Sequence, residues 1–222
     1  MKIVLFLIIT VLMMVPLAAQ SDETVKTVEK APTVINLSGV FFQKRDRFYD
    51  GYGALDNFKW SSDNWGVGST VFIGHGPLGV YSSGGLFIPS TYEFSNGYSA
   101  DTSWDGVRIG LDNISGVGFH LPIGPRMGII SGLGVHLDLV WYYKDIIPFP
   151  VGQAPEPAIY FDLGLGAGGA FYFQINEAMN IHFGGNYTWD FMQLHSNSKL
   201  KEDWAFNYAL NWSLLGGIGI KY

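Results

Sequence analysis

The sequence contains no cysteine, so disulfide bonds do not stabilise the fold and a thiol nucleophile is excluded. Charged residues are scarce as well: they make up 14% of the 222 residues, whereas soluble domains usually carry about a quarter. The net charge of −6 and the lack of a basic run argue against a nucleic-acid partner. Beyond residue 20, no window is apolar enough for a transmembrane helix. These absences disfavour both a water-exposed globular surface and a helical span in the rest of the chain.

The first twenty residues have the parts of a secretory signal peptide. A short basic start precedes an apolar run from Ile3 to Val15, and small residues follow before a polar segment. The apolar run is shorter than the roughly 20 residues that a spanning helix needs. We expect cleavage after Ala19 or Gln20, so that residues 1–20 are removed. An uncleaved membrane anchor is the alternative.

Glycine and aromatic residues are abundant, with 29 glycines and 16% aromatic side chains. Residues 21–32 are polar without periodicity, and we expect them to be a leader. Residues 33–222 are expected to form one domain, since all-β barrels commonly reach this length undivided. High aromatic content, few charges and no hydrophobic helix favour a β-barrel that faces lipid.

The segment from Trp204 to Tyr222 shows the pattern of a membrane strand most clearly. Alternate positions are large and apolar, and the positions between them are small or polar apart from Leu215. Because side chains alternate between the two faces of a strand, this segment predicts one strand with one apolar and one wet face. A helix would spread the same apolar residues around its whole circumference.

The same alternation recurs along the chain and predicts eight strands, joined in turn by long polar connections and tight turns. The long connections include residues 44–64 and 89–106. The predicted fold is all-β: an eight-stranded antiparallel up-and-down transmembrane β-barrel, whose closure leaves no unpaired strand edge in lipid. A secreted soluble β-sandwich is the alternative, but it would need more surface charge than this chain has.

The end of the chain resembles the C-terminal signature of bacterial outer-membrane proteins, which finish in an aromatic residue preceded by alternating apolar positions. The residues that carry this resemblance are Leu214, Ile218, Ile220 and Tyr222. It implies contact with outer-membrane lipid, escort by periplasmic chaperones and insertion by the outer-membrane barrel assembly machinery. The strand pattern resembles small barrels of the OmpA/OmpX type, with OmpW-like proteins as a neighbouring group. Such barrels have long external loops and short periplasmic turns, which would place both termini in the periplasm.

Inward-facing polar residues predict a cluster near the outer mouth of the barrel. Counted from the tight turns, aspartates on four consecutive strands lie at nearly one height, roughly 30 to 35 Å along the barrel. The predicted cluster consists of Arg108, Asp112, Asp138, Asp162, Asp190 and Asn207. It is either an acidic collar that favours cations, or a network of aspartates bonded to the arginine, the asparagine and neighbouring tyrosines. A polar network of this kind is expected in a barrel lumen whatever its function.

The pattern predicts a non-enzymatic protein that presents its extracellular loops, 44–64 and 89–106, to an external ligand or a host surface. Binding commonly resides in loops on a rigid scaffold. The alternative is a narrow porin-like channel or a small-molecule-binding barrel. Many inward positions are glycine, and an eight-stranded barrel can hold one small ligand.

The positions of the candidate catalytic groups argue against an enzyme. The nearest nucleophile and base are Ser196 and His195, followed by Asn197, with Glu202 across the last loop. This stretch loosely resembles the His-x-Ser-Asn arrangement of the lipid A deacylase family. Here the serine directly follows the histidine, and adjacent residues of a strand face opposite sides. No cofactor and no metal site are expected, since the histidines of the lumen need not converge.

Overall fold

The computed structural model describes residues 33–48, 59–94, 99–101, 108–143, 157–195, 204–205 and 209–221. The predicted signal peptide and leader lie outside these residues. All of the described strands belong to one compact unit, Pro32–Tyr222. Within the described ranges, no helix has the length and apolarity needed to cross a membrane.

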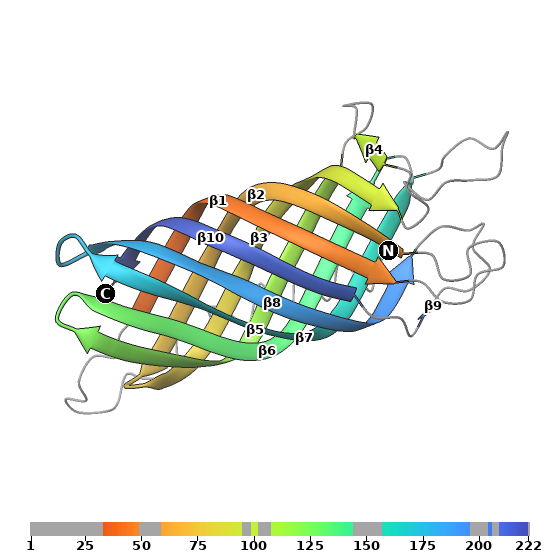
Figure 1. The fold of residues 1–222 in the computed structure, drawn as a ribbon. Coiled ribbons are helices and arrows are strands. Elements are labelled where there is room, and N and C mark those ends of the chain that lie inside the picture. Colours follow the sequence, from red (N-terminus) through yellow and green to blue (C-terminus); the bar gives the residue numbers. More distant parts are fainter. Residues whose placement is uncertain are drawn as a thin grey trace, which may run out of the picture. The chain divides into compact units, whose positions relative to one another are not determined.

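The described part of the chain is built from antiparallel strands (Figure 1). They are β1 (Thr33–Phe48), β2 (Lys59–His75), β3 (Leu78–Phe94), β4 (Ser99–Asp101), β5 (Arg108–Gly124), β6 (Met127–Tyr142), β7 (Ala158–Gln174), β8 (Met179–His195), β9 (Trp204–Ala205) and β10 (Ala209–Lys221).

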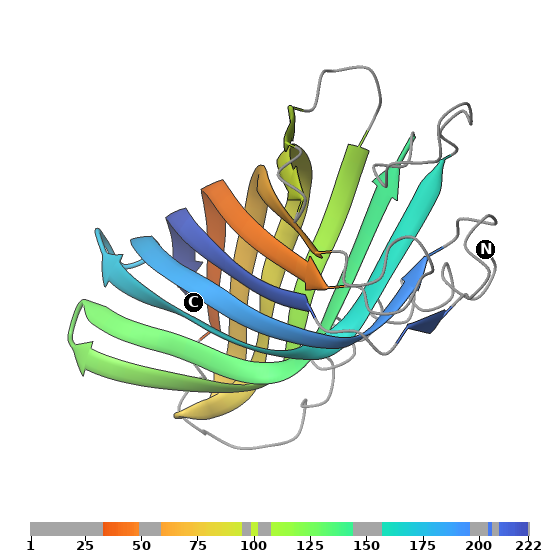
Figure 2. The same cartoon turned by 45° about the vertical axis from the view of Figure 1, so that its right-hand side comes forward.

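Eight of these strands are long and close into a ring. The order runs β10, β1, β2, β3, β5, β6, β7, β8, and β8 pairs with β10 again, so each long strand has a neighbour on both sides. The strands run obliquely around a common axis (Figures 1 and 2). The short strand β4 pairs with β3, and the short strand β9 pairs with β8. The prediction of an eight-stranded antiparallel up-and-down barrel is confirmed.

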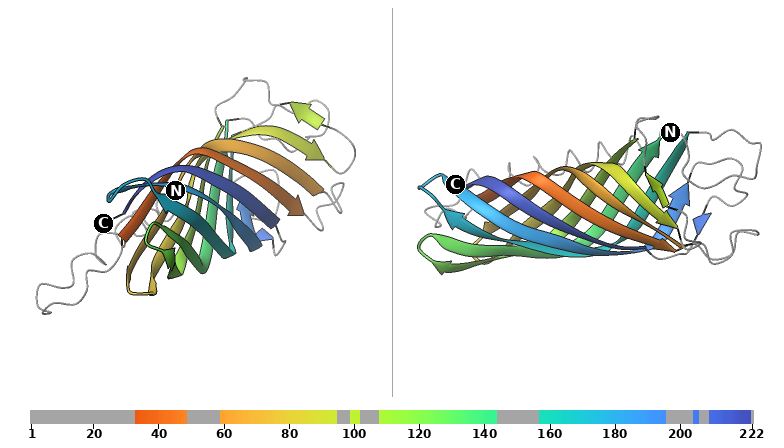
Figure 3. Two further views of the ribbon diagram at one scale, coloured as in Figure 1. Left: turned by 60° about the vertical axis from the view of Figure 1, so that its left-hand side comes forward. Right: turned by 45° about the horizontal axis from the view of Figure 1, so that its top comes forward.

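Tight turns join the long strands at one end of the barrel. Between β2 and β3, Gly76 has a φ of 68°, a left-handed conformation that glycine adopts without steric cost. Between β7 and β8, the Asn176 side-chain oxygen accepts hydrogen bonds from the backbone N–H groups of Ala178 and Met179, at 3.0 and 2.8 Å. The turns lie at the end where β10 finishes, and β9 lies at the other end (Figure 3).

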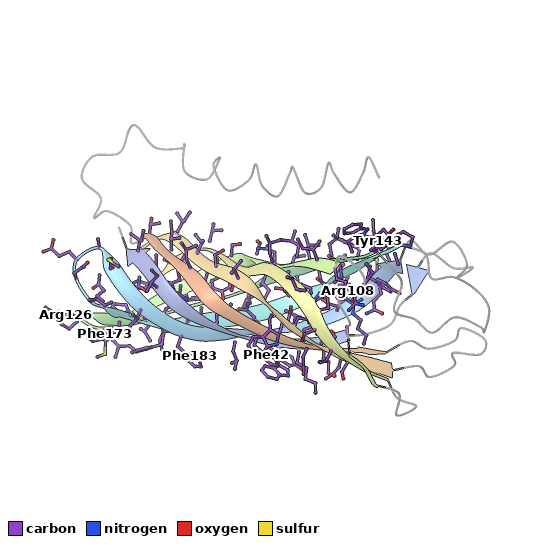
Figure 4. The ribbon with its side chains drawn as sticks, turned by 90° about the horizontal axis from the view of Figure 1, so that it is seen from above. Phe42, Arg108, Arg126, Tyr143, Phe173 and Phe183 are labelled. Carbon is purple, nitrogen blue, oxygen red and sulfur yellow. The ribbon has the colours of Figure 1, made fainter. Side chains whose placement is uncertain are left out.

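The outward face of the barrel is apolar and exposed. Leu37, Leu133 and Phe183 are 57%, 57% and 64% exposed, although they lie on regular strands. Phe42 and Phe183 project from the wall in Figure 4, and the Phe42 ring lies 5.0 Å from that of Trp65 on the adjacent strand. A continuous belt of exposed apolar and aromatic side chains is the surface that a transmembrane barrel presents to lipid.

Several strands are longer than the sequence pattern predicted. Residues 44–48 and 59–64, predicted as parts of a loop, belong to β1 and β2, and residues 89–94 and 99–101 belong to β3 and β4. Polar side chains do not interrupt a strand that faces the interior of a barrel, so a polar composition was the wrong criterion for these strand ends. Within the segment predicted to be a strand from Trp204, the described parts are β9 (Trp204–Ala205) and β10 (Ala209–Lys221), and both pair with β8; residues 206–208 lie outside the described residues.

A β-bulge in β1 changes which residues face inward. Ser38 pairs with Gly217 and Val40 with Gly216, so Gly39 is an extra residue in β1. One extra residue shifts the alternation by one position. The buried positions are therefore even-numbered before the bulge and odd-numbered after it: Val34, Asn36 and Ser38, then Gln43, Arg45 and Arg47.

Candidate functional site

Four of the predicted aspartates come together inside the barrel. Asp112, Asp138 and Asp162 pair side by side across β5, β6 and β7. Asp190 on β8 faces Gly164, two residues further along β7. All four are buried, with at most 1% of their surface exposed. The barrel register therefore brings four carboxylates from four consecutive strands to one part of the lumen.

Two arginines from β1 reach these carboxylates across the lumen. Arg45 binds Asp112 through an Nη2–Oδ2 distance of 3.1 Å and also pairs with Asp138. Arg47 lies 2.9 Å from Asp138 and 2.6 Å from Asp162, again between Nη2 and Oδ2. In the ring of eight, three strands separate β1 from β6 on either side, so β1 and β6 are opposite walls. These ion pairs therefore span the interior of the barrel.

A histidine joins the carboxylates at the two ends of the cluster. His136 is fully buried, with its Nδ1 2.5 Å from Asp190 Oδ1 and its Nε2 3.1 Å from Asp112 Oδ2. A protonated imidazole donates both of these bonds at once, whereas a neutral one donates only one. Asn211 on β10 adds a hydrogen bond of 2.8 Å to Asp190 Oδ2. The cluster thus includes residues from β1, β5, β6, β7, β8 and β10.

The cluster carries an excess of negative charge. Four ionised carboxylates against two guanidinium groups leave two negative charges, or one if His136 is protonated. Transferring an ionised group from water to a protein interior costs roughly several kcal/mol of free energy, unless charged or hydrogen-bonding partners compensate for it. The two arginines offset half of the negative charge of the four carboxylates. A further positive group in this part of the lumen is therefore electrostatically favoured.

Aromatic rings hold the arginine side chains in place. The Arg45 guanidinium carbon lies 4.3 Å from the centre of the Phe87 ring, and that of Arg47 lies 5.6 Å from the centre of the Tyr160 ring. Cations over aromatic faces are attracted by the ring quadrupole. Glycine at position 110 leaves room for the Phe87 ring, since a Cβ there would overlap with it.

The half of the lumen nearer the turns is filled mainly by rings and aliphatic side chains. Its core contains Val34, Phe72, Ile130, Ala170 and Tyr172, all of them buried. The Tyr172 hydroxyl lies 2.6 Å from His120 Nε2. On the neighbouring wall, Ser38 Oγ lies 3.0 Å from His182 Nε2. His120 and His182 thus have separate partners. The described residues contain no group of His, Cys, Asp or Glu arranged to hold a metal ion.

An open hollow of about 800 Å³ lies along β10, β1, β2, β3 and β5, and the exposed residues Leu37, Val67, Leu86 and Ile218 line it. One row of paired, inward-facing positions crosses the same strands. The row consists of Gly217, Ser38, Gly68, Gly85 and Asp112. Its first four residues are glycine or serine, so these strands contribute little side-chain volume to the lumen at this level.

The remaining predicted site residues lie elsewhere. Arg108 is half-buried on β5, level with Tyr142 and four residues before Asp112. Asn207 lies outside the described residues, as do Tyr222 and the sequence from Ser196 to Asp203, which contains Glu202. The predicted assembly residues Leu214, Ile218 and Ile220 lie on the outward face of β10 and are 45%, 56% and 38% exposed.

Arg45 and Arg47 were missed because residues 44–64 were predicted to be a loop outside the barrel. Residues 43–47 are all polar or charged, so this stretch of the sequence has no alternation of apolar and polar residues that would mark it as a strand.

Comparisons with known proteins support the fold. No protein-family profile matches the sequence, and no characterised protein sequence matches it. The outer membrane protein OprG from Pseudomonas aeruginosa has a similar structure, with a TM-score of 0.51 and 12% identity over 86% of this chain and 96% of its own. Ail, the attachment invasion locus protein of Yersinia pestis, gives 0.44 and 15% over 87% and 99%. The outer membrane protein AlkL gives 0.46 and 12% over 91% and 96%. At such identities, the similarity to OprG establishes the fold alone.

Proposed function

We propose that this chain is an integral protein of the bacterial outer membrane, without enzymatic activity, whose barrel anchors extracellular loops for contact with an external ligand or a host surface. The apolar outward belt supports insertion in lipid, and the fold is one that OprG shares. Both termini lie in the periplasm in this proposal, because β1 begins and β10 ends at the end that carries the tight turns.

The observation that carries the proposal is the set of ion pairs across the lumen. Arg45 and Arg47 connect β1 to the aspartates of β5, β6 and β7, so charged side chains occupy the path that a solute would follow. A barrel tied together in this way is suited to hold loops rigidly rather than to conduct. Function then resides in the connections at the end opposite the tight turns, in the sequence between β1 and β2 and between β3 and β5.

Recordings from planar bilayers test the closed lumen. We expect no unitary currents from the folded wild-type barrel, and currents from a double variant, Arg45→Ala with Arg47→Ala, in which the crossing side chains are removed. Heat-modifiable migration on a gel checks that both proteins are folded. Steady unitary currents from the wild type would favour the alternative, a narrow channel.

A loop exchange tests the binding role. Residues 50–57 or residues 102–106 are replaced by a short Gly-Ser connection, which leaves the described strands intact. Cells displaying either variant are expected to lose adherence to a host surface, while the barrel retains its heat-modifiable migration. A matched exchange of turn residues Asn176 to Ala178, at the periplasmic end in this proposal, serves as the control. Unchanged adherence in both loop variants would contradict the binding role.

Export and assembly follow from the same proposal. The signal peptide, residues 1–20, directs the chain to the periplasm, where chaperones and the barrel assembly machinery receive it. Deletion of Tyr222 is expected to lower the amount of heat-modifiable protein in the outer membrane, whereas Lys221→Ala is not. Equal amounts of the two variants in the membrane would argue against the C-terminal signal.

A further inference from the structure

We propose that two copies of this chain associate in the membrane through a polar patch on the outward face of the barrel. The patch consists of Ser69 on β2, Ser82 on β3, and Asn113 and Ser115 on β5. The proposal concerns the wall of the barrel and goes beyond what the loops contact. It rests on the position of the patch in the apolar belt, on its unused hydrogen-bonding groups and on the hollow beside it.

The patch interrupts the apolar belt near the middle of the barrel wall. Ser115 pairs with Val135, two residues from Leu133 at the middle of β6. On β3 and β5, apolar side chains that are 37% to 52% exposed lie on the same face before and after the patch: Val80, Leu86, Leu111 and Val117. The patch therefore lies where the outward side chains of a transmembrane barrel face hydrocarbon and are normally apolar.

Three side chains of the patch form a closed ring of hydrogen bonds. Asn113 Nδ2 donates to Ser82 Oγ at 3.0 Å, and Ser115 Oγ donates to Asn113 Oδ1 at 2.6 Å. The Ser82 hydroxyl completes the ring by donating to Ser115 Oγ at 3.3 Å, because the hydrogen of Ser115 is already used. The ring fixes the orientation of the Asn113 amide.

The ring leaves hydrogen-bonding groups unused. A side-chain amide has two N–H donors, and Asn113 uses one of them within the described residues. Each of the three oxygens in the ring also keeps a lone pair. Acyl chains offer neither donors nor acceptors, and an unsatisfied polar group in hydrocarbon is costly. A surface that offers both kinds of group is therefore favoured over lipid at this place.

The hollow of about 800 Å³ gives a neighbouring molecule room to approach the patch. Ser69, Gly84 and Asn113 pair side by side across β2, β3 and β5 and line this hollow. Larger apolar side chains line it as well: Leu37, Val67, Leu86, Leu111 and Ile218. Small residues let two membrane-embedded surfaces come close enough for hydrogen bonds to form between them.

A second copy of the chain fits because the patch is complementary to itself. It carries a donor, the second N–H of Asn113, together with hydroxyl acceptors, and it has no charged side chain. In a two-fold dimer each Asn113 can donate to an oxygen of the other copy, so the contact occurs twice. With the two-fold axis at the edge of the hollow, an apolar side chain such as Leu86 of each copy can enter the hollow of the other. An acyl chain would fill the hollow but leave the polar groups unsatisfied.

Energy transfer between labelled copies in lipid vesicles tests the proposal. Because the chain contains no cysteine, Glu177→Cys in the exposed turn between β7 and β8 can carry a donor or an acceptor dye. Both labelled forms, folded, are mixed at increasing protein-to-lipid ratios in phosphatidylcholine vesicles that hold no other protein. We expect energy transfer that saturates with protein density and follows a monomer–dimer equilibrium.

Two outward substitutions by leucine form a matched pair. Asn113→Leu removes the donor of the patch, and Ser131→Leu replaces an outward serine on β6 that lies outside the patch and the hollow. Asn113→Leu is expected to raise the protein density at half-association by about tenfold or more, since two-fold symmetry places the lost hydrogen bond in the interface twice. Ser131→Leu is expected to change this density by no more than about twofold, as surface substitutions away from a contact usually do.

Cross-linking locates the interface. In vesicles, a membrane-soluble bifunctional thiol reagent is expected to link copies of Ser69→Cys into dimers, because the two patches face each other. Ala167→Cys introduces the same thiol at an exposed, small outward residue of β7 and is the control. We expect no more dimer from this control than random collisions give.

A further variant, Ser69→Phe, fills the hollow without changing any charge and is expected to abolish association. It carries the test if Asn113→Leu does not fold, which heat-modifiable migration would reveal. The proposal is overturned if transfer between wild-type copies only rises in proportion to their density, as it would for a wall covered by lipid or reserved for a different protein. It is overturned as well if Asn113→Leu and Ser131→Leu associate equally, if Ser69→Phe still associates, or if both cysteine variants cross-link to the same extent.

Discussion

Arg47 on β1 and Asp138 on β6 lie 2.9 Å apart, between Nη2 and Oδ2, although 91 residues separate them in the sequence and their strands are opposite walls of the barrel. The backbone ladders bind each strand only to its two neighbours. Side chains across the lumen therefore add a second set of connections, perpendicular to the wall. The stability of the barrel should depend on both sets.

Replacing Asp138 by alanine should destabilise the barrel strongly. Arg45 and Arg47 both bind its Oδ2 atom, and both are buried. Leaving them without this partner is expected to lower the free energy of unfolding by about 3 to 5 kcal/mol. Urea unfolding in lipid vesicles, followed by tryptophan fluorescence, measures the loss. Asp46→Ala, on the outward side of β1, is the control, with an expected change within about 0.5 kcal/mol. Similar losses in both variants would contradict this role of the cluster.

His136 and Asp190 should be energetically coupled. Their Nδ1 and Oδ1 atoms lie 2.5 Å apart in the buried interior. In a double-mutant cycle with alanine at both positions, we expect a coupling energy of about 1 to 3 kcal/mol. His182, which lies on β8 as well but contacts Ser38, provides the comparison. Alanine at His182 and Asp190 should act additively within about 0.5 kcal/mol. Additivity in the first cycle would argue against the direct bond.

An arginine placed on the outward face should be costly near the middle of the barrel wall and tolerated near its end. Leu133 lies midway along β6 and is 57% exposed, and Tyr143 follows the end of the same strand and is 53% exposed. Leu133→Arg is expected to cost about 2 to 4 kcal/mol and Tyr143→Arg about 0 to 1 kcal/mol, because charge is penalised most at the bilayer midplane. Folding equilibria in vesicles give both values. Equal costs would mean that lipid does not cover this face.

Gly85 and Gly39 should differ in their response to a single added methyl group. At Gly85 a Cβ would lie 2.7 Å from Gly68 Cα and overlap with the Val67 carbonyl, whereas at Gly39 it would meet nothing within 4 Å. Gly85→Ala is therefore expected to lower the free energy of unfolding by about 1 to 3 kcal/mol. Gly39→Ala should change it by no more than about 0.5 kcal/mol. Urea unfolding in vesicles measures the free energy of unfolding of both variants. An unchanged free energy of unfolding in Gly85→Ala would contradict the close approach of β2 and β3.

The architecture of the barrel was accessible from the sequence because one face of each strand meets lipid. Leu133 and Val135 on β6, for example, alternate with Gly134 and His136, and this pattern sets both the strand and its inward face. Counting from the tight turns also placed Asp112, Asp138 and Asp162 at one height, and the strand register brings them side by side.

The partners of these aspartates could not be derived from alternation alone. Strict alternation from Leu37, which faces outward, would have placed Arg45 and Arg47 outward too, and only the bulge at Gly39 reverses this. A bulge of this kind leaves no periodic signal in a single sequence.

The extra residue in β1 gives the strand an unusual tolerance to changes in length. Deleting Gly39 would remove the bulge and leave Ser38 and Arg45 facing inward as before, because the alternation on the two sides would then be continuous. Deleting Lys44 instead would turn Arg45 and Arg47 towards the outside, and the buried aspartates would lose these ion pairs. Urea unfolding of the two deletion variants would separate these outcomes. A one-residue deletion in β1 is therefore expected to preserve the ion pairs when it removes Gly39 and to break them when it removes Lys44.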